Sequence, residues 1–144
     1  MTGLIVLVGV LVVATAYGVL ARRRSGRVRT PADTGERLTA AEVGEQLGDR
    51  ATLVQFSSAF CAPCRATRVI LADVAAHAEG VAHVEIDAES HLDLVRRLHI
   101  MKTPTTLVLD AEGRVRGRAS GQPRREQVLA ALTPLAVTSN GSVS

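Results

Sequence analysis

The stretch TLVQFSSAFCAPCRAT, residues 52–67, decides the fold because it joins a short apolar run to a helical one across two cysteines. Thr52–Phe56 is apolar and rich in β-branched residues, which predicts a buried strand. Arg65–Glu79 has the composition of a helix. The two cysteines of the chain, Cys61 and Cys64, therefore lie where the strand ends and the helix begins.

This position favours redox chemistry at the cysteine pair. The first turn of a helix presents unpaired N–H groups and the positive end of the helix dipole, which both stabilise an anion. Cys61 is therefore expected to form a reactive thiolate. Cys64, one turn further on, is close enough to attack a mixed disulfide on Cys61. Pro63 suits an early helical position and stiffens the turn.

Two other interpretations of the cysteines stay open. Cys61-x2-Cys64-x12-His77-x5-His83 matches the spacing of a two-cysteine, two-histidine zinc finger. Such a finger carries both histidines on one helix, whereas here Gly80 separates them and His83 falls in a strand pattern, so we expect no metal site. A purely structural disulfide closing so short a loop would add little stability.

The segments around the cysteine stretch alternate between helix and strand. The predicted order, α-β-α-β-α-β-β-α, indicates an α/β fold with a small mixed central sheet and helices on both faces. The expected elements are a short helix capped by Thr39, the strand and helix above, a strand at 81–86, a helix capped by Ser90, strands at 105–110 and 114–119 joined as a hairpin, and a last helix opened by Pro123.

The N-terminus precedes this domain with an apolar segment. Residues 1–21 contain no charged side chain and are long enough to cross a bilayer as a helix, which predicts one transmembrane anchor. Arginines follow the segment and only the α-amino group precedes it, so we expect the N-terminus outside and the domain in the cytoplasm. The alternative is a cleaved signal sequence, with Ala14-Thr15-Ala16 as a weak cleavage motif.

The basic character of the chain is concentrated next to this segment. Residues 22–37 carry six arginines against two acidic residues and are rich in small and polar residues, which predicts a basic, flexible linker. From Leu38 onward there are eleven basic and twelve acidic residues, and only two aromatic side chains, so nucleic-acid binding is not expected. The domain is predicted at residues 38–135, and residues 136–144 form a polar tail.

Four stretches resemble the thioredoxin family. TLVQFSSAFCAPCRAT is similar to its active-site segment, VEID to its third strand, IMKTPTTLVLDAEGRV to the segment with a cis-proline and a hairpin, and SGQPRREQVLAAL to its closing helix. The resemblance covers about Leu38 to Leu132. It implies a thioredoxin-like fold and a thiol–disulfide oxidoreductase that uses a redox-active disulfide, without another cofactor, on the thiols and disulfides of proteins.

The resemblance also implies roles for single residues. Cys61 would be the attacking cysteine and Cys64 the resolving one, the two forming a disulfide when oxidised. Pro104 would be the cis-proline that faces them. The backbone of Thr103 would bind a substrate strand, with Ala62 and Pro63 at the same surface.

Four positions depart from the family pattern, and two of them, Ser57 and Phe60, stand where the site usually has tryptophans. Gln55 stands where thioredoxins usually carry a buried aspartate that accepts the proton of the resolving cysteine, and His83 stands where a lysine is frequent. Both are candidates for a proton relay, although an exposed strand histidine is the simpler interpretation of His83.

Three functions follow from the sequence. The favoured one is a membrane-anchored, cytoplasmic protein-disulfide reductase supplied with electrons by a reductase that the sequence does not identify. The second is an extracytoplasmic reductase similar to the tethered relatives of cytochrome maturation. The third is a thioredoxin-fold binding module whose cysteines do not turn over.

Overall fold

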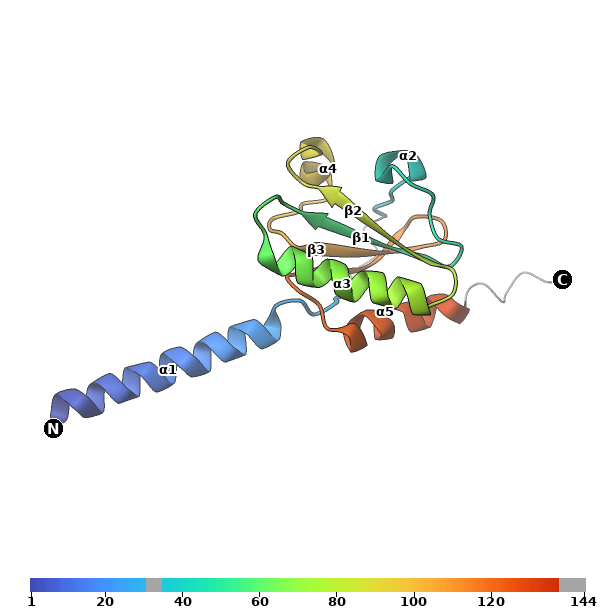
Figure 1. Cartoon of the computed structure of the whole chain (residues 1–144). Helices are drawn as coiled ribbons and strands as arrows, with labels where there is room; N and C mark the ends of the chain where they lie inside the picture. Colours follow the sequence, from blue (N-terminus) through green and yellow to red (C-terminus); the bar gives the residue numbers. More distant parts are fainter. Residues whose placement is uncertain (31–34, 138–144) are drawn as a thin grey trace.

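A computed structural model describes residues 1–30 and 35–137, and its elements follow the expected order (Figure 1). The elements are α1 (Thr2–Arg24), α2 (Ala40–Val43), β1 (Ala51–Ser57), α3 (Ala62–His77), β2 (Val81–Asp87), α4 (Leu92–Arg97), β3 (Thr105–Asp110), β4 (Val115–Ser120) and α5 (Arg125–Val137).

The four strands form one mixed sheet in the order β2-β1-β3-β4. β1 and β2 are parallel because α3 crosses between them, whereas β1 pairs with β3 and β3 with β4 in antiparallel fashion. The tight turn between β3 and β4 contains Gly113 at φ 82°, a left-handed conformation that glycine adopts without strain. The expected mixed sheet is confirmed.

Helices cover both faces of the sheet, as expected. α3 and α5 lie on one face and α2 and α4 on the other (Figure 1). Side chains alternate along β1, so that Leu53 packs with Leu71 of α3, while Val54 and Phe56 pack with Leu98 after α4. All seven residues of β1 are therefore buried, including the polar residues Thr52, Gln55 and Ser57, which explains why most of this strand is apolar.

The helix caps agree with the sequence at one place and differ at another. Thr39 caps α2 through a capping box with Glu42. The sequence predicts Ser90 as the cap of α4, but the residue at that position is His91 and it makes no side-chain capping bond. The hydroxyl of Ser90 instead donates to the carboxylate of Asp87 at the end of β2, a local bond that competes with capping.

α1 is a 23-residue helix that ends at Arg24, three residues beyond the expected boundary. It is about 34 Å long at 1.5 Å per residue. None of its residues is buried against the rest of the described chain. The helix is long enough to cross a membrane, and it contains an 18-residue window with a mean hydropathy of 2.6, which is apolar enough to do so. A signal sequence near an N-terminus has the same properties.

The segment expected as a flexible linker, 22–37, is largely paired with the domain in its described parts, 22–30 and 35–37. The N–H of Gly26 donates to the carbonyl of Ser120 at 2.7 Å, and Arg29 and Arg118 exchange two backbone hydrogen bonds. Further along, the N–H of Val115 donates to the carbonyl of Glu36 at 3.0 Å.

The physical reason for this difference is the sheet edge at β4. An edge strand presents N–H and C=O groups that require partners, and the backbone of the supposed linker supplies them whatever its side chains are. Residues 31–34 lie outside the described residues. Of the expected tail, residues 136 and 137 belong to α5, and 138–144 lie outside the described residues.

Candidate redox site

The two cysteines form a disulfide at the start of α3. Their Cα atoms are 5.2 Å apart. Cys61 is the N-cap of α3, and its Sγ accepts a hydrogen bond from the backbone N–H of Cys64 at 3.2 Å. Cys64 is 1% exposed, whereas Cys61 is partly exposed. Cys61 is thus accessible to a partner and its sulfur accepts a hydrogen bond from an N–H group, whereas Cys64 is buried.

A second loop lies beside the disulfide at this end of the sheet. The Thr103–Pro104 peptide bond is cis, and Pro104 is buried. The hydroxyl groups of Ser58 and Thr103 are 3.0 Å apart and share a hydrogen bond, which joins the cysteine loop to the proline loop. Ala62 and Pro63, by contrast, are exposed at the surface.

Gln55 is 0% exposed and lies beneath the cysteines. Its Nε2 donates to the carbonyl of Cys64 at 2.8 Å, and its Oε1 is 3.2 Å from Nε2 of His83. Because a carbonyl only accepts, the amide oxygen must face the histidine, so Nε2 of His83 carries the proton. In the neutral ring the free lone pair is then on Nδ1, and Gln55 offers no route for a proton from Cys64 to His83.

His83 is half-buried, which corrects the expectation of an exposed strand histidine. Burial lowers its pKa, while the carboxylate of Glu85 acts in the opposite direction. The imidazole is therefore neutral at physiological pH. In this geometry its Nε2 contacts the amide oxygen of Gln55.

Glu85, Arg68 and Ser57 complete this polar cluster, and the sequence interpretation assigned none of them a part in it. Glu85 accepts hydrogen bonds from the guanidinium of Arg68 and from the hydroxyl of Ser57. The bond from Arg68 is the main reason why the pKa of Glu85 is lowered. The sequence pattern of β2 could have identified Glu85, because it lies two residues after His83 and therefore shares the same face of the strand.

The residues of the zinc-finger spacing are not brought together. His77 lies in the last turn of α3 beside Asp73, and His83 is bound to Gln55. Within the described parts of the chain, no three metal-binding side chains gather at one point.

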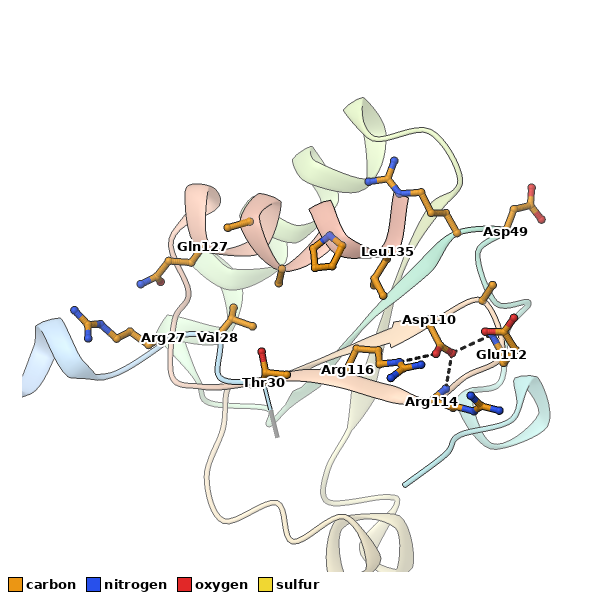
Figure 2. A pocket seen from close by; sticks show the side chains of 15 residues that line it. Arg27, Val28, Thr30, Asp49, Asp110, Glu112, Arg114, Arg116, Gln127 and Leu135 are labelled. Atoms are coloured by element: carbon orange, nitrogen blue, oxygen red, sulfur yellow. Dashed lines mark hydrogen bonds and ion pairs between the residues drawn. The ribbon is translucent and has the colours of Figure 1, made fainter. Parts of the chain in front are cut away.

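A hollow of about 1040 Å³ lies away from the disulfide, at the other end of the sheet (Figure 2). It is bounded by the docked segment around Val28, by the β3–β4 turn and by α5. Asp110 accepts hydrogen bonds there from the side chain of Arg116 and from two backbone N–H groups, so its charge is compensated. Neither cysteine lines this hollow, and the hydrogen bonds of Asp110 stabilise the turn.

The fold and the site define a class of redox protein, in which a mixed sheet carries a Cys-x-x-Cys disulfide at the start of a flanking helix. Comparison with known proteins identifies the family. The family model described as Thioredoxin matches residues 36–133. The chain therefore belongs to the thioredoxin family. The resemblance inferred from the sequence is confirmed.

The relatives agree with this assignment. Thioredoxin from Alicyclobacillus acidocaldarius subsp. acidocaldarius is 34% identical over 86 residues, which are 59% of this chain and 81% of that protein. Thioredoxin domain-containing protein 2 of Homo sapiens is 34% identical over 61 residues, 42% of this chain but only 11% of its own length.

Solved structures show the same fold. Chloroplastic thioredoxin z superposes with a TM-score of 0.56 at 22% identity, covering 68% of this chain and 86% of that one. Spinach chloroplast thioredoxin f (short form) has a TM-score of 0.54 at 22% identity, covering 62% and 79%. The family and the cysteine pair support a thiol–disulfide oxidoreductase that needs no cofactor beyond its own disulfide.

Proposed function

We propose that this chain is a membrane-anchored protein-disulfide reductase whose attacking residue is Cys61. The observation that carries the proposal is the asymmetry of the pair. Cys61 is partly exposed and its sulfur faces an N–H group at the start of α3, whereas Cys64 is 1% exposed. An N–H donor and the helix dipole stabilise a thiolate at the exposed sulfur, where a partner disulfide has access.

The reaction is a two-electron exchange. The Cys61 thiolate attacks one sulfur of the partner disulfide, the partner's S–S bond breaks, and the second partner sulfur leaves and takes a proton. Cys64 then loses its proton and attacks Cys61, which releases the partner as a dithiol and forms the Cys61–Cys64 disulfide. A reductase of unidentified nature returns two electrons to the pair.

The loop at Thr103 and Pro104 is the proposed substrate surface. It is joined to the cysteine loop by the hydroxyl contact with Ser58 and is continuous with exposed Ala62 and Pro63. An extended substrate segment adds to the backbone of Thr103 as a short strand, so that backbone hydrogen bonds supply affinity without demanding one sequence.

Gln55 and His83 are proposed to act as positioning residues. The amide of Gln55 is bound on both sides, to the Cys64 carbonyl and to His83, and it holds the resolving cysteine in place. Because a neutral amide does not accept a proton at physiological pH, deprotonation of Cys64 is the slow step.

The apolar segment 1–21 is proposed as the anchor and residues 38–135 as the domain, with the domain in the cytoplasm. Support comes from the length and hydropathy of α1 and from Arg22, Arg23 and Arg24 at its C-terminal end.

The test is reduction of a protein disulfide in the presence of a small dithiol. The wild-type chain is expected to exceed the rate of the dithiol alone, Cys61→Ser to abolish the excess, and Cys64→Ser to accumulate mixed disulfides. A wild-type rate equal to that of the dithiol would reject the reductase and leave a binding module.

A further inference from the structure

The backbone just after α1 is hydrogen-bonded to the sheet at the level where β1 leads into the redox site. Phe56 of β1, Thr105 of β3 and Ser120 of β4 are register partners across the sheet. The N–H of Gly26 continues this row by donating to the carbonyl of Ser120 at 2.7 Å. At about 4.8 Å per strand, Gly26 lies roughly 14 Å from Phe56, just after which the cysteine loop begins.

The attachment is tight. Gly26 is buried at φ 80°, and a Cβ atom built on it would lie 1.9 Å from the carbonyl oxygen of Gln122. One residue, Ser25, separates it from the last residue of α1. The first residue after β4, Gly121, donates its N–H to the carbonyl of Pro104 at 2.7 Å. Figure 1 shows α1 meeting the domain at the end where α3 begins.

The surface at this end suits a bilayer. A hollow of about 490 Å³ lies between the anchor exit and the proline loop, and its lining includes Arg24, Arg27, Arg29 and Lys102. Lys102 is the neighbour of Thr103, so the cationic hollow reaches the proposed substrate loop. Lipid phosphates are the natural counter-charges of such a juxtamembrane cluster.

Two large apolar side chains extend this surface around the disulfide. Phe60, directly before Cys61, and Met101, before Lys102, are both almost fully exposed. Apolar side chains next to cations are the combination that binds the membrane–water interface. The acidic residues Asp87, the last of β2, and Glu89, just after it, lie on the opposite side of β1 from the anchor.

From these observations we propose that the redox disulfide faces the membrane surface and that its partner is an integral membrane protein with a cysteine pair at that surface. The inference rests on the proposed function and anchor and adds the partner class. The opposite end of the sheet, with the β3–β4 turn, lies about 20 Å farther from the anchor, the length of a six-residue strand.

The exchange with this partner balances without a further reactant. The Cys61 thiolate attacks the partner's disulfide at the bilayer surface, and Cys64 displaces the reduced partner. Two electrons pass to the membrane protein, its two sulfurs gain two protons, and Cys61 and Cys64 become a disulfide.

A fluorescence experiment tests the orientation without activity. The chain has no tryptophan, so Phe60→Trp and Ala111→Trp each create a single probe, one at the redox end and one in the β3–β4 turn. The full chain is placed in vesicles of neutral and anionic phospholipid that carry a spin label on some headgroups. We expect the label to quench more than half of the indole emission of the Phe60→Trp variant and less than a tenth of that of the Ala111→Trp variant.

Matched glycine variants test whether the attachment at Gly26 causes this orientation. Gly26→Ala introduces the clash with Gln122, whereas Gly35→Ala, at a similar φ of 67°, has nothing within 4 Å of the new Cβ. The first variant should remove most of the difference between the two probes and the second should keep it. Without either glycine change, equal quenching of the two probes, or stronger quenching of the probe in the β3–β4 turn, would overturn the proposed orientation.

An exchange experiment tests the partner class. Two transmembrane peptides carry the same disulfide loop, one directly at the bilayer surface and one beyond a helical spacer of about 27 residues, roughly 40 Å. The reduced wild-type chain should react at least about tenfold faster with the surface loop because the anchor raises its effective concentration there. Equal rates would reject the membrane partner alone, whereas no reaction with either peptide or with a soluble disulfide would reject the reductase itself.

Discussion

Replacing Gln55 with aspartate is the most informative perturbation of the site, because it places a carboxylate beneath the cysteines. Position 55 is 0% exposed and pairs in register with Thr106, whose buried hydroxyl has no hydrogen-bond partner in the described chain. That hydroxyl would be available to donate to the new carboxylate. Full burial raises a carboxyl pKa by about 3 units, from about 3.9 to about 7.

A carboxylate with this pKa is suited to accept the proton of Cys64. General-base catalysis contributes up to roughly 10²-fold or more, and about half of the new carboxyl groups would be ionised at pH 7, so we expect resolution to accelerate at least about tenfold there. The advantage should shrink towards pH 9, because the increasing concentration of hydroxide then removes the proton of Cys64 without the carboxylate.

The same substitution should cost stability with a defined pH dependence. The pKa of the introduced carboxyl is raised in the folded state, so the folded state binds more protons than the unfolded state between about pH 3.9 and 7, and stability falls as the pH rises through this window. Relative to Gln55→Asn, which has the same size and no charge, we expect about 0.5 kcal/mol lower stability at pH 4 and about 4 kcal/mol lower at pH 7.

The assay is single-turnover release of a mixed disulfide from Cys61, followed from pH 6 to pH 9, with urea unfolding at pH 4 and pH 7 in parallel. Gln55→Asn is the control for the shorter side chain and the lost hydrogen bonds. Equal release rates for the aspartate and asparagine variants over the whole range would refute the argument that deprotonation of Cys64 limits the reaction.

Two further predictions concern topology and acid stability. A fluorescent protein that folds only in the cytoplasm should be bright when fused to Ser144, and alkaline phosphatase at the same place inactive; the reverse pair of results would place the domain outside. Burial opposes ionisation of Asp110, but hydrogen bonds from Arg116 and from backbone N–H groups outweigh burial and lower the pKa of its carboxyl. The ionised carboxylate therefore stabilises the fold above about pH 4, and this stabilisation disappears as the pH falls below that value. Asp110→Asn should cost about 1–2 kcal/mol at pH 7 and almost nothing at pH 2, measured by urea unfolding.

The sequence determined the features that depend on local pattern. The order of helices and strands, the cysteines at a strand–helix junction and the long apolar segment all follow from the spacing of side chains within a few turns or a single strand. The helix boundaries were less well determined: α1 continues to Arg24, and Ser90 bonds to Asp87 instead of capping α4.

Tertiary structure alone decided which residues meet. Gln55, His83 and Glu85 form one cluster because the register of β1 against β2 places them on the same face, and a slip of one residue would separate them. The composition of residues 22–37 indicates a flexible linker, but the unpaired edge of β4 binds their backbone, which every sequence possesses. That pairing, which side-chain patterns do not encode, places the end of α1 at the same end of the sheet as the disulfide.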